Sequence, residues 1–245
     1  MELHVIGTGS SGNAYLLKAG DSALLLDAGL PIKQIMRAVP DWKQLDGCLI
    51  THEHLDHSKA AAAVAALGVK TYASAGTIQA ITRNGALNVF EAIRSGFPFG
   101  VGKFSVMPFE TQHDAAEPLG FLIRYDPTGE LTLYATDTYY LRFTFPGVHY
   151  WIIECNYIQD FLDEDEDLSP ALRTRLGRSH MSLLRLLDVL EANDLSKTRS
   201  IVLIHLSDER SDEKVMVGAV KQKTGIEDVV AASAGITIPL ELAPF

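Results

Sequence analysis

Residues 52–57 read His-Glu-His-Leu-Asp-His, which places three imidazoles and a carboxylate within six positions, next to the apolar run Cys48–Ile50. Neutral imidazole and ionised carboxylate are the groups that hold Zn²⁺ and similar divalent ions in proteins. A histidine-rich polar loop without chemistry is the alternative. So many ligand groups in one hexapeptide favour a metal site.

The spacing within this stretch indicates more than one ion. In an extended chain alternate residues face the same side, so His52 and His54 can reach one metal. Asp56 and His57 come just beyond and are expected to point elsewhere, as a second metal would require.

Composition narrows the class of protein. The chain has 245 residues, of which 47% are hydrophobic and 21% charged, a profile typical of globular proteins. No repeat or linker divides it, so we expect a single domain over residues 1–245. The net charge of -10 does not favour a general binding surface for polyanions such as nucleic acid. Any contact with nucleic acid would need a local basic patch and bound metal ions.

Cysteine usage and the first residues predict a compartment. Cys48 and Cys155 both lie in apolar, strand-like contexts and are expected to be core thiols rather than a disulfide. Residues 1–7 do not form a basic segment followed by a long apolar one, and no run approaches the length of a membrane span. We therefore expect a cytoplasmic protein with no membrane partner.

Apolar periodicity predicts an α/β chain. The expected strands are Leu3–Ile6, Ala14–Leu17, Ala23–Leu26, Gly47–Thr51, Val69–Tyr72, Phe104–Phe109, Gly120–Arg124, Leu131–Ala135, Tyr150–Ile153 and Ile201–Ile204. The expected helices are Ile32–Val39, Ser58–Leu67, Thr77–Arg83, His180–Leu190 and Asp212–Lys221. The acidic run Asp160–Asp167 is interpreted as a solvated loop without chemistry.

Titratable residues follow several of these strands. His52, His113, Asp137 and His205 each come at or shortly after the end of one. Ends of strands in α/β sheets are where ligand and catalytic sites form, whereas burial in the core would leave such groups without partners. The pattern favours one shared site.

These motifs together resemble the metallo-β-lactamase fold family of metal-dependent hydrolases. The signature His-x-His-x-Asp-His occupies residues 52–57, and His113, Asp137 and His205 follow in order. Five segments are also similar to the YycJ (WalJ) group, which is regarded as nuclease-like and related to ribonuclease Z; they are residues 7–13, 113–118, 135–137, 154–156 and 203–207.

The resemblance implies a four-layer αββα sandwich of two mixed sheets flanked by helices, with two divalent metal ions in a cleft. The first ion would be held by His52, His54 and His113, the second by Asp56, His57 and His205, with Asp137 bridging the two. Zn²⁺ suits this set and Mn²⁺ is tolerated. A hydroxide between the ions would be the nucleophile.

The resemblance also implies a proton donor. Glu154 and His180, the latter in a His-x-Ser motif with Ser182, match a pair thought to protonate the leaving oxygen. Asp56, His180 and Glu154 are thus the expected catalytic residues of an exonuclease-like phosphodiesterase acting on DNA or RNA. One alternative is a thioesterase or lactonase similar to glyoxalase II, which does not need the pair. The other is a non-catalytic scaffold that retains metals.

Residues around the site receive supporting roles. Asp27 either hydrogen-bonds a ligand histidine or forms a turn before Gly29. Arg178 and Arg185 belong to an arginine cluster near His180 that either contacts phosphate or forms a solvated helix face. Residues 7–12 match the Gly-x-Gly-x-x-Gly fingerprint, but a strand follows, so no nucleotide cofactor is expected. The sequence is compatible with a homodimer.

Overall fold

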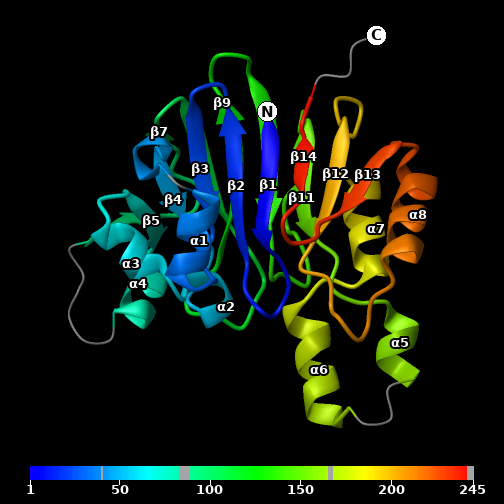
Figure 1. The fold of residues 1–245 in the computed structure, drawn as a ribbon. Coiled ribbons are helices and arrows are strands. Elements are labelled where there is room, and N and C mark those ends of the chain that lie inside the picture. Colours follow the sequence, from blue (N-terminus) through cyan, green and yellow to red (C-terminus); the bar gives the residue numbers. More distant parts are fainter. Residues whose placement is uncertain (40, 83–88, 165–167, 242–245) are drawn as a thin grey trace.

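Two mixed β-sheets lie face to face in the computed structural model, which describes residues 1–39, 41–82, 89–164 and 168–241 (Figure 1). Sheet A contains, in spatial order, β14 (Thr237–Pro239), β1 (Glu2–Gly7), β2 (Ala14–Ala19), β3 (Ser22–Leu26), β4 (Gly47–Leu49), β5 (Thr71–Ser74) and β6 (Phe90–Ile93). Sheet B contains β13 (Asp228–Ala231), β12 (Ser200–Ile204), β11 (Tyr150–Glu154), β10 (Glu130–Ala135), β9 (Leu119–Tyr125), β8 (Phe104–Glu110) and β7 (Phe99–Val101).

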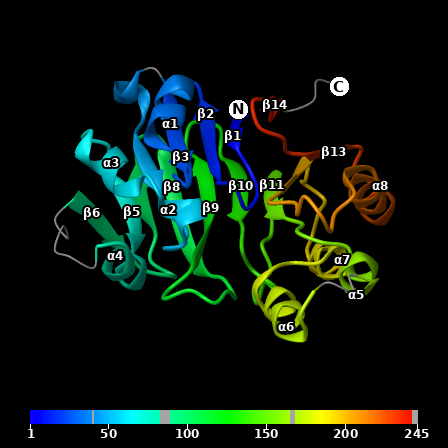
Figure 2. The same ribbon diagram turned by 60° about the horizontal axis from the view of Figure 1, so that its bottom comes forward.

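Helices cover the outer face of each sheet. On sheet A these are α1 (Ile32–Ala38), α3 (Ala61–Ala66) and α4 (Ala75–Ile81), and on sheet B they are α7 (Leu183–Glu191) and α8 (Glu213–Thr224). The short helix α2 (Leu55–Ser58) and the pair α5 (Gln159–Glu164) and α6 (Pro170–Ser179) lie at one end of the sandwich (Figures 1 and 2). A 3₁₀ turn covers Trp42–Gln44.

Strand alternation produces the layers. In β1 and β2, Leu3, Val5, Tyr15 and Leu17 face the core between the sheets, whereas Leu16 packs on the helix side of sheet A. Residues of both sheets fill the central layer, and separate apolar clusters join each sheet to its own helices. The arrangement confirms the predicted four-layer αββα sandwich.

Local boundaries differ from the sequence-based expectation in ways that matter for the site. The strand expected over Gly47–Thr51 ends at Leu49. The helix expected over Ser58–Leu67 is replaced by α3 and by the separate turn α2. The helix expected from His180 begins at Leu183, because Ser182 caps it by accepting a hydrogen bond from the backbone N–H of Arg185.

Other expectations fail for reasons of packing. Part of the acidic run is helical rather than a loop, since Leu162 of α5 is buried against Tyr157 and Leu168; residues 165–167 lie outside the described residues. The strand expected at Val69–Tyr72 is shifted to β5. The four strands at the sheet edges, β6, β7, β13 and β14, were not predicted. Pro40 and Arg83, expected near helix ends, are outside the described residues.

Candidate metal centre and active site

The loop after β4 and the turn α2 carry the histidine-rich stretch. His54 has extended backbone angles and immediately precedes α2, so the chain changes direction between His54 and Asp56. The separation of the two ligand pairs predicted from an extended chain therefore arises from a strand-to-helix turn. Asp56 and His57 are the two middle residues of the four-residue helix α2, and His57 is fully buried.

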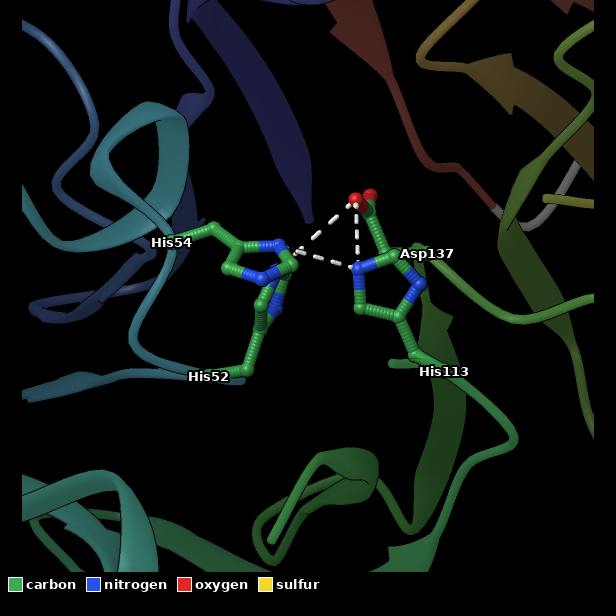
Figure 3. A group of neighbouring side chains, drawn as sticks. All are labelled: His52, His54, His113 and Asp137. Carbon is green, nitrogen blue, oxygen red and sulfur yellow. Dashed lines mark hydrogen bonds and ion pairs between the residues drawn. The ribbon is translucent and has the colours of Figure 1, made fainter. Parts of the chain in front are cut away.

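One group of side chains contains His52, His54, His113 and Asp137, whose ligand atoms all lie within 4.8 Å of one another (Figure 3). His54 Nδ1 and His113 Nε2 are 3.1 Å apart. His52 Nε2 and His113 Nε2 lie 3.8 and 3.6 Å from Asp137 Oδ2. The four groups converge from three separate segments of the chain.

A second group contains Asp56, His57, Asp137 and His205, again within 4.8 Å. His57 Nε2 lies 3.4 Å from Asp56 Oδ2 and 3.1 Å from Asp137 Oδ1. His205 Nδ1 is 2.5 Å from Asp137 Oδ1, and its Nε2 is 3.9 Å from Asp56 Oδ2. The fold thus also brings together the residues predicted to hold the second ion.

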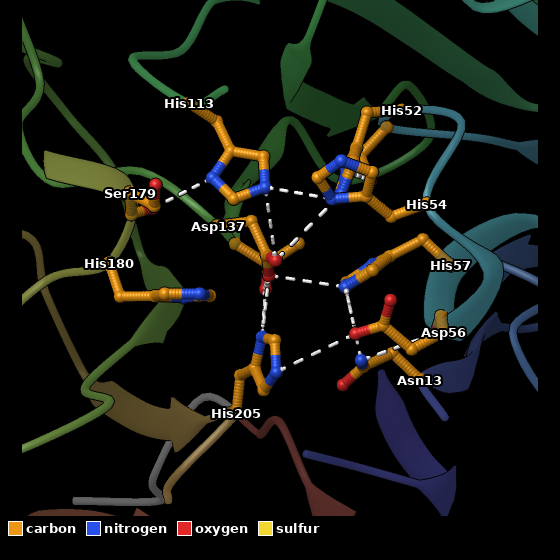
Figure 4. Close-up of polar contacts among 12 residues, drawn as sticks. Asn13, His52, His54, Asp56, His57, His113, Asp137, Ser179, His180 and His205 are labelled. Carbon is orange, nitrogen blue, oxygen red and sulfur yellow. Dashed lines mark hydrogen bonds and ion pairs between the residues drawn. The ribbon is translucent and has the colours of Figure 1, made fainter. Parts of the chain in front are cut away.

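Asp137 lies between the two groups and presents one carboxylate oxygen to each (Figure 4). Oδ2 faces His52 and His113, whereas Oδ1 faces His57 and His205. This is the disposition that a carboxylate needs in order to share two ions about 3.5–4 Å apart.

Three non-glycine residues of the described chain have positive φ, and all three belong to this region. They are Asp27 (φ 57°), Asp137 (φ 47°) and His205 (φ 53°), each at or just beyond the end of a strand. The left-handed conformation is unfavourable for such residues and is maintained only where surrounding contacts enforce it. Here it accompanies side chains that meet in one buried polar cluster.

Asp27 orients a proposed ligand through a buried hydrogen-bond network. Its Oδ2 accepts from His57 Nδ1 at 2.8 Å and from the Tyr134 hydroxyl at 2.6 Å. Its Oδ1 accepts the backbone N–H of Thr51 at 2.8 Å. Because Nδ1 is engaged by the carboxylate, Nε2 is the His57 nitrogen that faces the cluster and is left to bind a cation. The contact between Asp27 and His57 is thus present, and the role of Asp27 as support for a ligand histidine stays a prediction.

Two further orienting contacts were not predicted. His113 Nδ1 donates to the carbonyl oxygen of Ser179 at 2.8 Å, which likewise leaves Nε2 facing the cluster. The amide nitrogen of Asn13 lies 3.1 Å from His57 Nε2 and donates to the carbonyls of Gly9 and Asp56. Asn13 ends the glycine-rich motif of residues 7–13, whose glycines alone matched a known fingerprint and gave no signal for this amide.

The ionisation of the cluster suits cations. Burial, aided by neighbouring imidazoles, holds the pKa of His52 well below its ordinary value, so its ring is neutral. Burial opposes the charge of Asp137, but His205 and His57 outweigh it and hold its pKa well below the usual range. Burial also lowers the pKa of His57, but Asp137 and Asp27 prevail and raise it well above normal. A bound cation would take the place of that proton.

An unsatisfied atom supports the same conclusion. Among the described side chains, His52 Nε2 is one of a few buried polar atoms without a hydrogen-bond partner, although His52 Nδ1 contacts the Thr51 hydroxyl at 3.0 Å. A buried nitrogen is expensive to leave unpaired, and a metal ion would satisfy it. The donor set of imidazoles and carboxylates therefore fits divalent metal ions.

Glu154 and His180 form a close pair beside the cluster. His180 Nδ1 lies 2.6 Å from Glu154 Oε1, while Oε2 accepts the backbone N–H groups of Thr138 and Met181, both at 3.0 Å. Burial lowers the pKa of His180, but the charge and hydrogen bond of Glu154 outweigh it and raise the pKa to about 9. The ring points toward Asp137 (Figure 4). At neutral pH this imidazole is therefore protonated.

A cavity of about 280 Å³ opens onto these groups. Its lining includes His54, Asp56, His113, Asp137, His180 and His205. Arg175 and Arg210 also line it, whereas Arg178 is exposed elsewhere on α6 and Arg185 packs 5.0 Å from the Tyr139 ring. Phosphate binding by Arg178 and Arg185 stays a prediction, but two other arginines border the cavity.

Comparisons with known proteins agree with this geometry. The family model described as "Beta-lactamase superfamily domain" matches residues 23–206. The exodeoxyribonuclease WalJ of Streptococcus pneumoniae is 26% identical over 255 residues, covering 97% of this chain and 91% of the relative.

Solved structures show the same fold. The metallo-beta-lactamase fold protein YhfI from Bacillus subtilis superposes with a TM-score of 0.74 at 18% identity, covering 97% of this chain and 98% of that one. The short form of human tRNase Z gives 0.64 at 15% identity, with 99% and 100% covered. The family resemblance inferred from the motifs is confirmed. In the described residues, none of the helices is long and apolar enough to cross a membrane.

Proposed function

The chain belongs to the beta-lactamase superfamily, and from this premise we propose that it is a dinuclear metal-dependent phosphodiesterase with exonuclease activity. The observation that carries the proposal is the Glu154–His180 pair next to a double cluster of metal-ligand side chains. A phosphodiester expels an alkoxide, which needs a proton, whereas a thiolate can leave without one. The pair therefore favours phosphodiester over thioester cleavage.

Each ligand has a proposed place. His52, His54 and His113 hold one ion, Asp56, His57 and His205 hold the other, and Asp137 is shared. When bound, the two ions supply a polarised phosphate and a water of lowered pKa. We take Zn²⁺ as the first candidate and Mn²⁺ as the second, because imidazole and carboxylate ligands accept both.

The chain's own groups divide the proton transfers. Burial opposes the charge of Asp56, but the hydrogen bond and charge of His57 keep its pKa below the ordinary value, so the carboxylate is available at the cavity to accept a proton from water. His180, held through Nδ1 by Glu154, presents its other ring nitrogen for donation to the departing oxygen.

DNA is the proposed substrate ahead of RNA, because the relative WalJ is named an exodeoxyribonuclease. A single domain over residues 1–245, a cytoplasmic location and homodimer formation remain predictions.

The decisive experiment compares substrates and one variant. Purified protein, after metal analysis, is incubated with labelled single- and double-stranded DNA and RNA in Zn²⁺ or Mn²⁺, beside a thioester. We expect shortening of DNA, and a loss of about a hundredfold or more in rate for His180→Ala with unchanged metal content. His4→Ala serves as the matched control, because His4 lies on the surface and contacts Thr237. Thioester turnover without nucleic-acid cleavage would contradict the proposal.

A further inference from the structure

The wall of the cavity opposite the histidine-rich loop comes from α6. Its last turn reaches the metal-ligand cluster directly, since the Ser179 carbonyl accepts from His113 Nδ1. Arg175 and Leu176 of the same helix line the cavity. In Figure 2, α6 lies at the end of the sandwich beyond the sheets. A substrate strand leaving the cavity on this side must pass the helix.

Asp114 connects Arg175 to the cluster. Asp114 Oδ2 accepts from Arg175 Nε at 2.9 Å, and its Oδ1 accepts from the Ser179 hydroxyl at 3.0 Å. The same Oδ1 lies 3.6 Å from His113 Nε2. One carboxylate thus stands between the guanidinium and His113, a proposed metal ligand, and links the position of the guanidinium to the cluster.

The ion pair leaves most of the guanidinium available. Within the described residues, Nε is the nitrogen of Arg175 that makes a contact, so the two terminal nitrogens keep their donors. The Arg175 side chain is 62% exposed, and an ion pair this exposed contributes little to stability. A planar fork of N–H donors matches the oxygens of a phosphate group.

We propose that Arg175, positioned by Asp114, binds a backbone phosphate of the substrate strand next to the one being cleaved. This inference rests on the proposed function and adds the residue that recognises a strand with more than one phosphate. It explains why a cation lines the cavity of a chain whose net charge is -10.

The test compares a substrate that has neighbouring phosphates with one that has none. The metal-loaded enzyme is assayed on a labelled DNA oligonucleotide and on bis(p-nitrophenyl) phosphate. Arg175→Ala should lower kcat/KM for the oligonucleotide by about tenfold or more, mainly through KM, and leave the small diester unchanged. Arg175→Lys should lower kcat/KM for the oligonucleotide less than Arg175→Ala does, since lysine keeps the charge but lacks the planar fork of donors. Asp114→Asn should raise the same KM by a smaller factor.

Arg124→Ala provides the matched control. Arg124 Nε makes an exposed 2.9 Å contact to Asp126, the same geometry as the Arg175–Asp114 pair, on β9 and outside the cavity lining. Arg124→Ala should leave kcat/KM unchanged for both substrates. Arg178→Ala tests the neighbouring arginine on α6.

The outcomes separate the two proposals. A wild type that degrades no oligonucleotide overturns the proposed function and this inference with it. A wild type that does so, with Arg175→Ala equal to Arg124→Ala, overturns this inference alone. An equal loss on both substrates would show that Arg175 supports the metal centre rather than a second phosphate. A larger effect in Arg178→Ala would also contradict it.

Discussion

The half of the site next to sheet A and the half next to sheet B are built in different ways. On sheet A, one segment of six residues supplies four proposed ligands, and the buried carboxylate of Asp27 contacts one of them, His57. On sheet B, single residues come from separate strand ends: Asp137 after β10, Glu154 at the end of β11 and His205 after β12. One half depends on local chain geometry and the other on strand register.

Register explains why the dispersed residues meet. The strands β10, β11 and β12 are parallel neighbours, with Ala135 opposite Ile153 and Glu154 opposite Ile204. Residues that follow these strands are therefore level with one another at one edge of the sheet. The comparison predicts that the residue shared by both halves is the most sensitive, and that residues acting within one half are less so.

The largest effect is expected for Asp137→Asn. Asparagine keeps one oxygen and replaces the other by an NH₂ group, which is not a metal ligand, so the side chain can no longer present an oxygen to both groups. Bound ions supply several kcal/mol of transition-state stabilisation, so the rate should fall by about a thousandfold. Elemental analysis should show fewer than two ions per chain. Asp188→Asn on the exposed face of α7 is the control. Full metal occupancy in Asp137→Asn would argue against a shared ligand.

The next effect concerns the sheet B half and pH. His180 donates a proton only while protonated, and its pKa is raised to about 9, so kcat should fall as pH rises through about 9. In Glu154→Gln the raising charge is gone while burial, which lowers the pKa, remains. The fall should then begin below neutral pH, with a loss of about a hundredfold at pH 8.

The measurement is a pH–rate profile of the wild type and of Glu154→Gln, with metal content determined at each pH. Coincident profiles, or a shift that follows metal loss, would remove His180 as the acid.

A smaller effect is expected from the sheet A half through Asp27→Asn. The amide cannot accept from His57 Nδ1, the Tyr134 hydroxyl and the Thr51 N–H together, so His57 loses its fixed orientation. Contacts of this kind typically contribute 10- to 100-fold in metal affinity. Competition with a chelator measures it. Tyr134→Phe keeps the ring, removes one contact to the same carboxylate and should weaken binding less. A stronger effect in Tyr134→Phe than in Asp27→Asn would contradict the assignment of His57 orientation to the Asp27 carboxylate.

The smallest effect is expected for Ser182→Ala. The serine of the His-x-Ser motif caps α7, and loss of such a cap costs about 1 kcal/mol. The thermal midpoint should drop by about 2–4 °C. The cleavage rate should stay within about twofold of wild type. A tenfold loss of rate at full metal content would instead give Ser182 a part in positioning His180.

The contiguous candidate ligands were predictable from the amino acids, because ligand type and spacing are properties of neighbouring residues. Apolar runs of strand length predicted an α/β chain, and the αββα architecture followed from the resemblance of the motifs and their order to a known family. The turn at Leu55, the assistance of Asn13 and the Ser179 carbonyl, and the place of Arg175 at the cavity were not. These depend on contacts between residues far apart in the chain, such as Asn13 with His57 and His113 with the Ser179 carbonyl, which outweigh local preference, as does the left-handed backbone at Asp27, Asp137 and His205.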